Sequence, residues 1–168
     1  MKTNLSSLMS IVDEKERNFS TFSYNLKSYA VNTSTQELNG TVNVTEDYKE
    51  DFEKEFEEYK ETQKQITKLK AIIHQKNNEL KLSDGRTIQE AIIDNTNLRK
   101  MKTLYKSLLS IRNSKRRITE VNNSYFECRT MNFDIKEVQK EYEELEKRIQ
   151  NTDFEISKLN SIEFEVNI

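Results

Sequence analysis

The chain has 168 residues, of which 33% are charged and 42 are Leu, Ile, Val or Phe, and its net charge is −2. The apolar share, about a quarter, exceeds the roughly 20% that marks disordered chains, so we expect a folded protein. No apolar run reaches the ~20 residues of a membrane span, the first residues form no hydrophobic signal segment, and the single cysteine excludes an intrachain disulfide. Together these features predict a cytoplasmic protein.

Two long helices are predicted in the first half of the chain. Apolar residues recur every seven positions in each of them, a spacing typical of helices that pack as coiled coils. The first helix is expected over about 5–27 and the second over about 46–82, with Thr45 as its N-terminal cap. The segment between them is rich in Asn, Thr and Ser and predicts a loop with strand-like pieces at 29–31 and 41–44. The two apolar ladders are Leu5, Val12, Phe19 and Leu26, and Phe52, Tyr59, Ile66, Ile73 and Leu80.

The sharpest local signal is the turn that follows the second helix. Gly85 can adopt positive φ and end that helix, with Asp84 before it and Arg86 after it. Thr87 and Glu90 match a capping box, in which each side chain accepts a hydrogen bond from the other residue's backbone N–H. The simplest interpretation is a structural turn between antiparallel helices. The alternative is that Asp84 and Arg86 bind a ligand.

The second half predicts two more helices, over about 88–112 and 134–160. Between them, the segment 117–130 favours a small β-hairpin, with an extended loop as the alternative. Alternating apolar residues at 162–168 predict a strand-like tail. The expected fold class is therefore mainly all-α: one elongated domain over 1–168, built of long antiparallel heptad-patterned helices that form helical hairpins. The apolar face of the third helix is expected to be Ala91, Leu98, Met101, Tyr105 and Leu108.

Three stretches carry a resemblance to a known family. They are LKSYAV at 26–31, LSDGRTIQEAI at 82–92 and RIQNTDF at 148–154. Together they resemble the septicolysin-like family of short bacterial proteins, over most of the chain. The resemblance implies a helical-hairpin fold with a small β element and transfers no catalytic residue. The family name implies a membrane-active, haemolysin-like cytolysin, which is the alternative function.

Catalytic, phosphate-binding and metal-binding motifs do not occur in the sequence, so we expect neither an enzyme nor a cofactor nor a metal site. His74 is the only histidine and has no flanking metal ligand, and Cys128 has no histidine at motif spacing. Both are interpreted as ordinary side chains. The stretch 46–61 contains nine acidic and three basic residues, but its carboxylates point around the predicted helix, which indicates a solvated face.

The main basic cluster lies in the predicted hairpin and is the candidate interaction surface. It comprises Arg116, Arg117, Tyr125, Phe126 and Arg129, with Arg112 and Lys115 beside them. Nucleic acid is disfavoured as its ligand because the chain is acidic overall. We prefer pairing with acidic helix faces, including those of a neighbouring subunit. The expected function is a self-associating helical scaffold or protein-interaction module: a homo-oligomer through helix seams, with an unidentified protein partner and without membrane binding.

Overall fold

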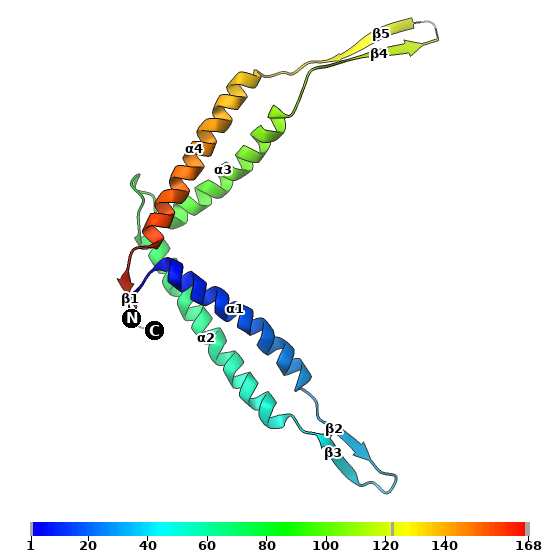
Figure 1. Ribbon diagram of the computed structural model, residues 1–168, viewed down its shortest axis with the longest axis vertical. Coiled ribbons are helices and arrows are strands. Elements are labelled where there is room, and N and C mark those ends of the chain that lie inside the picture. The colour runs from blue at the N-terminus through cyan, green and yellow to red at the C-terminus, as the bar shows by residue number, and fades with distance from the viewer. Residues whose placement is uncertain (1, 122, 167–168) are drawn as a thin grey trace. The chain divides into compact units, whose positions relative to one another are not determined.

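The computed structural model describes residues 2–121 and 123–166. This part of the chain is mainly helical, with four helices and three small antiparallel strand pairs, which confirms the mainly all-α prediction in its coarse form (Figure 1). Contacts within the chain group it into two compact units. The first unit is Met1–Glu79 with Asn160–Ile168, and the second is Leu80–Leu159.

The first unit is built on an antiparallel helix pair, α1 (Leu5–Ser28) and α2 (Lys49–Glu79) (Figure 1). The side-chain oxygen of Asn4 caps α1 by accepting a hydrogen bond of 2.8 Å from Ser7 N. One stripe of each helix meets the other, as expected for helices that are apolar on one side only. The core of the unit consists of Leu8, Val12, Leu69 and Val166, with Ile11, Ile72, Ile73 and Phe164 packed against it.

The two ends of the described chain meet in the first unit. Strand β1 (Lys2–Thr3) pairs antiparallel with β6 (Phe164–Glu165), and Thr3 lies opposite Phe164. The predicted tail strand is therefore present but shorter than 162–168, and positions 167–168 lie outside the described residues. Because Phe164 and Val166 join the core of α1 and α2, the C-terminal segment completes the first unit.

The segment between α1 and α2 is a β-hairpin, where the sequence predicted a loop with strand-like pieces at 29–31 and 41–44. The piece at 41–44 overlaps the second strand of the hairpin, whereas 29–31 lies in neither strand. Strand β2 (Thr33–Gln36) pairs antiparallel with β3 (Val42–Glu46). Gly40 lies in the turn between them and adopts φ +88°, a conformation that favours glycine. The cap prediction at Thr45 was wrong, because this residue lies in β3 and donates a hydrogen bond of 3.0 Å from Oγ1 to the carbonyl oxygen of Thr33. Asp47 takes over the capping role, since its Oδ1 accepts a hydrogen bond of 3.0 Å from Lys49 N.

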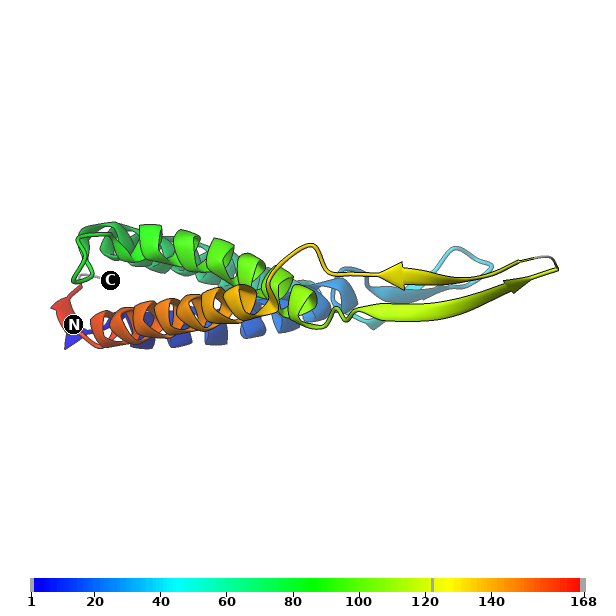
Figure 2. The same cartoon turned by 90° about the horizontal axis from the view of Figure 1, so that it is seen from above.

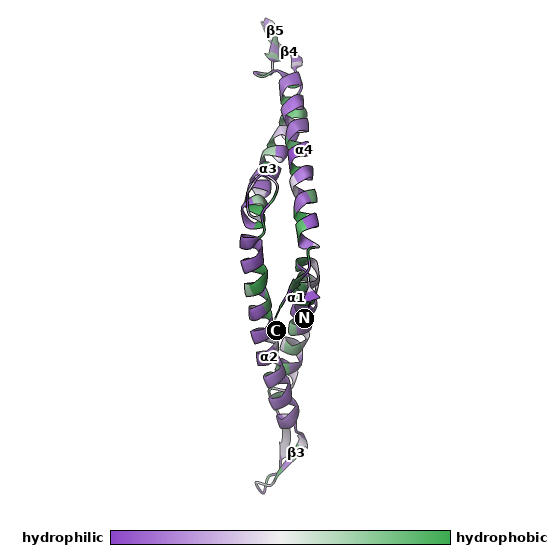
Figure 3. Ribbon diagram, turned by 90° about the vertical axis from the view of Figure 1, so that its left-hand side faces the viewer, coloured by the Kyte–Doolittle hydropathy of each residue, from purple (hydrophilic) through white to green (hydrophobic). Residues whose placement is uncertain are grey.

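The second unit consists of α3 (Ile88–Leu109), α4 (Ile135–Asn160) and a hairpin of β4 (Ser114–Glu120) and β5 (Asn123–Arg129). The hairpin extends beyond the ends of both helices as a two-stranded ribbon (Figure 2). Purple and green residues alternate along the helices, the pattern of helices that bury one side (Figure 3). The buried helix positions of this unit are Ile88, Ala91, Asn95, Leu98, Ile149 and Thr152.

Within the described residues, no helix is both long and apolar enough to cross a bilayer.

The small core of the first unit gives a direct stability prediction. Leu69 is 2% exposed and lies in the core, whereas Leu38 is fully exposed in the β2–β3 connection. We expect Leu69→Ala to lower the free energy of unfolding by about 2–4 kcal/mol, because it removes buried methyl groups and leaves a cavity. Leu38→Ala should change it by less than about 0.5 kcal/mol. Urea unfolding followed by circular dichroism measures both, and equal effects would contradict this description of the core.

Candidate interaction surfaces

The turn between α2 and α3 is closed by its own backbone and by a complete capping box. Leu82 N donates to Arg86 O over 2.8 Å, and Gly85 has φ +89°. Glu90 N donates to Thr87 Oγ1 over 3.1 Å, while Thr87 N donates to Glu90 Oε2 over 2.8 Å. These bonds satisfy N–H groups that the first turn of a helix otherwise leaves without partners.

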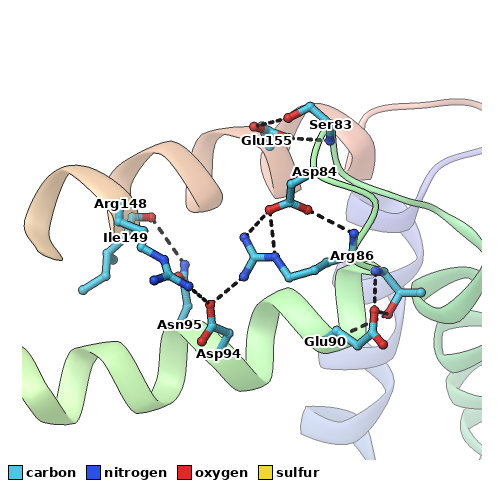
Figure 4. Close-up of polar contacts among 10 residues, drawn as sticks. Ser83, Asp84, Arg86, Glu90, Asp94, Asn95, Arg148, Ile149 and Glu155 are labelled. Atoms are coloured by element: carbon cyan, nitrogen blue, oxygen red, sulfur yellow. Dashed lines mark hydrogen bonds and ion pairs between the residues drawn. The ribbon is translucent and has the colours of Figure 1, made fainter. Parts of the chain in front are cut away.

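The guanidinium group of Arg86 is held between two carboxylates (Figure 4). Its Nε donates to Asp84 Oδ2 over 2.8 Å, and its Nη1 donates to Asp94 Oδ2 over 2.6 Å. Asp94 Oδ2 also accepts a hydrogen bond of 2.8 Å from Arg148 Nη2 on α4. Asp94 thus connects the turn, α3 and α4 through charge-assisted hydrogen bonds, which are about twice as strong as neutral ones.

Two further contacts tie α4 to the rest of the second unit (Figure 4). The carboxylate of Glu155 accepts hydrogen bonds from Ser83 N (2.9 Å) and Ser83 Oγ (2.8 Å). Asn95 is 1% exposed, and its Nδ2 donates to Ile149 O (3.3 Å) and Asp153 Oδ1 (2.9 Å). Both bonds of Asn95 Nδ2 reach α4, so they restrict how α3 and α4 can align, while its Oδ1 is buried without a hydrogen-bond partner in the described part of the chain.

These contacts shift the ionisation of the groups involved. Hydrogen bonds from Arg86 lower the pKa of Asp84. The same contact raises the pKa of Arg86, because the Asp84 carboxylate accepts hydrogen bonds from its guanidinium group. Backbone N–H donors have the same effect on two other carboxylates: Thr87 N lowers the pKa of Glu90, and Ser83 N lowers the pKa of Glu155. In each case a hydrogen bond to the charged form favours that form.

The turn is therefore best explained as a structural joint. An open hollow of ≈ 590 Å³ lies beside it, lined in part by Arg86, Arg148 and Glu155. The charged groups of these three side chains already bond to other groups of the protein. A ligand would have to replace existing bonds, so we do not assign a binding role to Asp84 and Arg86.

The β4–β5 hairpin separates the five residues of the predicted interaction surface. Residues directly opposite each other in an antiparallel ladder share a face, and successive residues alternate between faces. Arg116 lies opposite Glu127 and Ser114 opposite Arg129. Glu127 is 3.9 Å from Arg116 and 3.8 Å from Arg129, so ion pairs neutralise this face. Tyr125 lies on the same face and donates a hydrogen bond of 3.3 Å to Glu120.

The other side of the hairpin keeps its positive charge. Lys115 lies opposite Cys128, and Arg117 lies opposite Phe126. The ammonium group of Lys115 is 4.3 Å from the centre of the Phe126 ring, and Phe126 is 57% exposed. Among the described residues of this side no carboxylate is present, since the remaining pair is Thr119 and Ser124. We call these six residues the basic face.

An apolar stripe on α3 was missed in the sequence. Ala91 and Leu98 are buried as predicted, but Met101 is 46% exposed. Successive positions on a helix are 100° apart, which places Met101 only about 60° from the buried Leu98, whereas Ile93 and Leu104 lie on the side opposite the buried one. We call the two exposed apolar residues of that side, Ile93 and Leu104, the α3 stripe. Their spacing of eleven residues, which returns to within about 20° of the same direction, was the signal that could have revealed it.

The single histidine and the single cysteine are both exposed, and neither belongs to a group of described side chains that could hold a metal ion. His74 lies on the exposed side of α2, and Cys128 is an exposed free thiol in β5. The described residues contain no group of three His, Cys, Asp or Glu side chains that could hold a metal ion.

Comparison with known proteins identifies a family and a fold. The family of unknown function DUF6847 matches residues 30–163. A crystal structure of a functionally unknown conserved protein from Corynebacterium diphtheriae is similar, with a TM-score of 0.66 and 20% identity. The match covers 98% of this chain and 100% of that one, and at this identity it shows the fold alone. None of the curated proteins matches the sequence.

The resemblance to the septicolysin-like family is therefore wrong. The matched range 30–163 includes the stretches 82–92 and 148–154, and it belongs to a different family. The structure explains 82–92 as turn and capping chemistry, which unrelated helical proteins share. The cytolysin alternative depended on this resemblance and is withdrawn with it.

Substitution of Gly85 tests the joint. A Cβ atom at this position would meet no atom within 4 Å, so the cost comes from the positive φ alone. We expect Gly85→Ala to lower the free energy of unfolding by about 1–2 kcal/mol. Gly40→Ala is the matched control, because Gly40 has the same φ but lies in an exposed hairpin outside the core. It should leave the loss of helical signal on heating unchanged, and an identical shift for both variants would contradict the role of the joint.

The lowered pKa values of Asp84, Glu90 and Glu155 predict a loss of stability in acid. A carboxyl group whose pKa is lower in the folded state stabilises the fold above its unfolded pKa, and this contribution is lost as pH falls through the folded value. The ordinary values are 3.8 and 4.5. We therefore expect the urea midpoint to decrease below about pH 4.5. Asp84→Asn should reduce the decrease, and a midpoint that rises in acid would contradict the sign.

Proposed function

Because this chain belongs to the family of unknown function DUF6847, we propose its function from geometry: it is a self-associating helical scaffold that presents β-hairpins to partners. Coiled-coil-type packing between copies is part of this proposal. The proposal gives the chain no catalytic role and places it in the cytoplasm.

The observation that carries the proposal is the exposed area of the chain, 12714 Å². A globular protein of about 10 kDa, the mass of each unit, exposes roughly 5,200 Å², so two entirely separate units would expose about 10,500 Å². The exposed area of the chain is larger than this sum by about 2,000 Å². A stable protein interface removes only about 800 Å² from each partner, so the excess is large enough to supply one.

The α3 stripe is the part of this area best suited to a second copy. Leu104 is 58% exposed and Ile93 is 55% exposed, on the side of α3 that faces away from the buried Leu98. Large apolar side chains that stay exposed on the outward side of a helix are candidate contacts for another helix. The apolar positions of α4 near its N-terminus are also only half-buried, which leaves more of the predicted heptad seam open to another helix: Ile135, Val138, Tyr142 and Leu145.

Light scattering tests the proposal. We expect the parent protein at micromolar concentration to have a mass above the 20.0 kDa of one chain. Two charges placed in the α3 stripe, Ile93→Glu with Leu104→Glu, should reduce the mass to that of a single chain, because burying an unpaired carboxylate is costly. Thr103→Glu adds a charge to an exposed position about 100° around the same helix and should leave the mass unchanged.

Circular dichroism must show that the helices of each variant are intact. A parent protein that stays at 20.0 kDa across the micromolar range would exclude self-association.

A further inference from the structure

We propose that β3 pairs antiparallel with β3 of a second copy of the chain, so that the two β2–β3 hairpins join into one sheet. Asn43 lies at the centre of this pairing, on the twofold axis between the two copies. The inference rests on the proposed self-association and assigns part of it to a strand contact that does not involve the α3 stripe.

The outer edge of β3 is open. Within the described part of the chain β3 pairs with β2 alone, and the hairpin extends beyond the ends of α1 and α2 (Figure 1). Residues 41–46 are all exposed. A strand edge presents backbone N–H and C=O groups in the geometry that another strand needs. A two-stranded sheet is also only marginally stable by itself, so a further strand stabilises it.

The backbone contacts of the hairpin show which groups point outward. Glu37 N donates to Thr41 O over 2.8 Å, so the backbone of Thr41 is turned toward β2. Residues of an antiparallel strand alternate between those that bond to the neighbouring strand and those that do not. Asn43 therefore also bonds toward β2, whereas the N–H and C=O groups of Val42 and Val44 point away from it.

The sequence of this edge is complementary to itself. Residues 42–44 read VNV, with a threonine on each side, so the order is the same in both directions. When two such strands run antiparallel about Asn43, Val42 of one copy lies opposite Val44 of the other. The backbone groups of both valines point outward, so each of these pairs exchanges its N–H···O=C bonds. The pairing thus uses every outward backbone group of the two valines.

The pairing also covers exposed apolar area. Val42 is 57% exposed and Val44 is 59% exposed, and both lie on the side of the hairpin that carries Ser34 and Gln36. Opposite residues of a ladder share a face, so the valines of the two copies meet on that one side. Strand β2 has the sequence TSTQ and no apolar residue, so pairing through its edge would cover none.

A bulge fixes the register. Strand β3 contains one extra residue, Thr45, because the register of the hairpin shifts between Thr33 and Ser34. The regular edge therefore ends before Thr45. A pairing centred one residue later would rely on backbone groups beyond this bulge, and a pairing centred one residue earlier would leave Val44 opposite a glycine. A centre at Asn43 pairs both valines.

Charge favours self-pairing at this hairpin over the β4–β5 hairpin. A strand that pairs with its own copy brings similar residues together, and like charges opposite each other destabilise a sheet. The edge over 41–45 is uncharged, and Glu46 follows it beyond the bulge. Strand β4 instead carries Lys115, Arg116 and Arg117, and charged side chains commonly protect strand edges from pairing.

The strand contact is small. A stable interface removes about 800 Å² from each partner, more than a few residues of one strand supply. We therefore expect strand pairing at concentrations above those at which the helices associate.

Disulfide cross-linking tests the register in the full chain. Two variants carry Cys128→Ser, and one adds Asn43→Cys while the other adds Thr35→Cys. In the proposed pairing the two copies of position 43 have Cα atoms about 4.5 Å apart, within the range that a disulfide spans. The two copies of position 35 lie three strand spacings apart, about 14 Å, which is too far. Both positions are exposed on the same side of the hairpin, so accidental collisions affect them equally.

With a mild oxidant, Asn43→Cys should form the linked dimer at least about tenfold faster than Thr35→Cys, because only the first pair of thiols is held in reach. Non-reducing gel electrophoresis measures both rates. Equal rates for the two variants would overturn the inference.

Added charge tests the valine contact. Val42→Lys with Val44→Lys, combined with Asn43→Cys, should slow the cross-linking about tenfold, because like charges then meet across the joined edge. Ser34→Lys with Gln36→Lys is the matched control, since it adds the same charge to the same side of the hairpin but on β2. It should slow the cross-linking much less, and equal slowing by both pairs would contradict the contact. Circular dichroism must show that the helices are intact.

Further results separate the possible failures. A parent that stays monomeric, with equal cross-linking at positions 43 and 35, overturns both this inference and the proposed function. An oligomer with equal cross-linking at the two positions overturns this inference alone. Preferential cross-linking at position 43, in a parent that keeps the mass of one chain in the micromolar range, supports this inference and overturns the α3 contact.

An unrelated strand-forming peptide with one cysteine tests the choice of partner. Cross-linking of Asn43→Cys to this peptide should be much slower than to a second copy. Equally fast cross-linking would assign the edge to extended peptides in general and overturn the second copy as its partner.

Discussion

A pair of helices can bury only the stripe that each turns toward the other, and this constraint governs the whole structure. Ten apolar side chains are buried in the described part of the chain, too few to position four helices by packing alone. Charged groups supply what the core does not. In the second unit Asp94 joins two arginines from different segments, and Asp153 accepts hydrogen bonds from Arg99 and from the buried Asn95. Such bonds are directional, so they fix the alignment of α3 and α4.

Features that depend on neighbouring residues could be predicted from the sequence. The starts of α1 and α3, at Leu5 and Ile88, follow from apolar spacing together with a local cap. The pairing of β2 with β3 could not be predicted in the same way, because strands are stabilised by residues across the ladder. Thr45 illustrates the difficulty. Its hydroxyl group is suited to capping a helix, but in the structure it donates a hydrogen bond to the carbonyl oxygen of Thr33 on the neighbouring strand.

The candidate surfaces show a similar division. Basic and aromatic residues in the predicted hairpin were visible as a cluster, but their grouping depends on register, and a shift by one residue would exchange the two sides. The α3 stripe was overlooked because the predicted apolar face of this helix included neither Ile93 nor Leu104. Met101 shows a related difficulty: it belongs to the predicted apolar face but is 46% exposed, because only the position of α4 decides how much of that face is covered. The misleading family resemblance arose where local turn chemistry, not ancestry, sets the residues.

The position of Cys128 has a practical consequence. It is the only cysteine of the chain, its thiol is exposed, and it lies opposite Lys115 on the basic face. A thiol-reactive fluorophore would therefore label the unaltered sequence at a single site, without the removal of competing cysteines. The dye would lie on β5, two residues from Phe126 and on the same side of the hairpin. The protein thus carries its own attachment point for spectroscopy on the basic face.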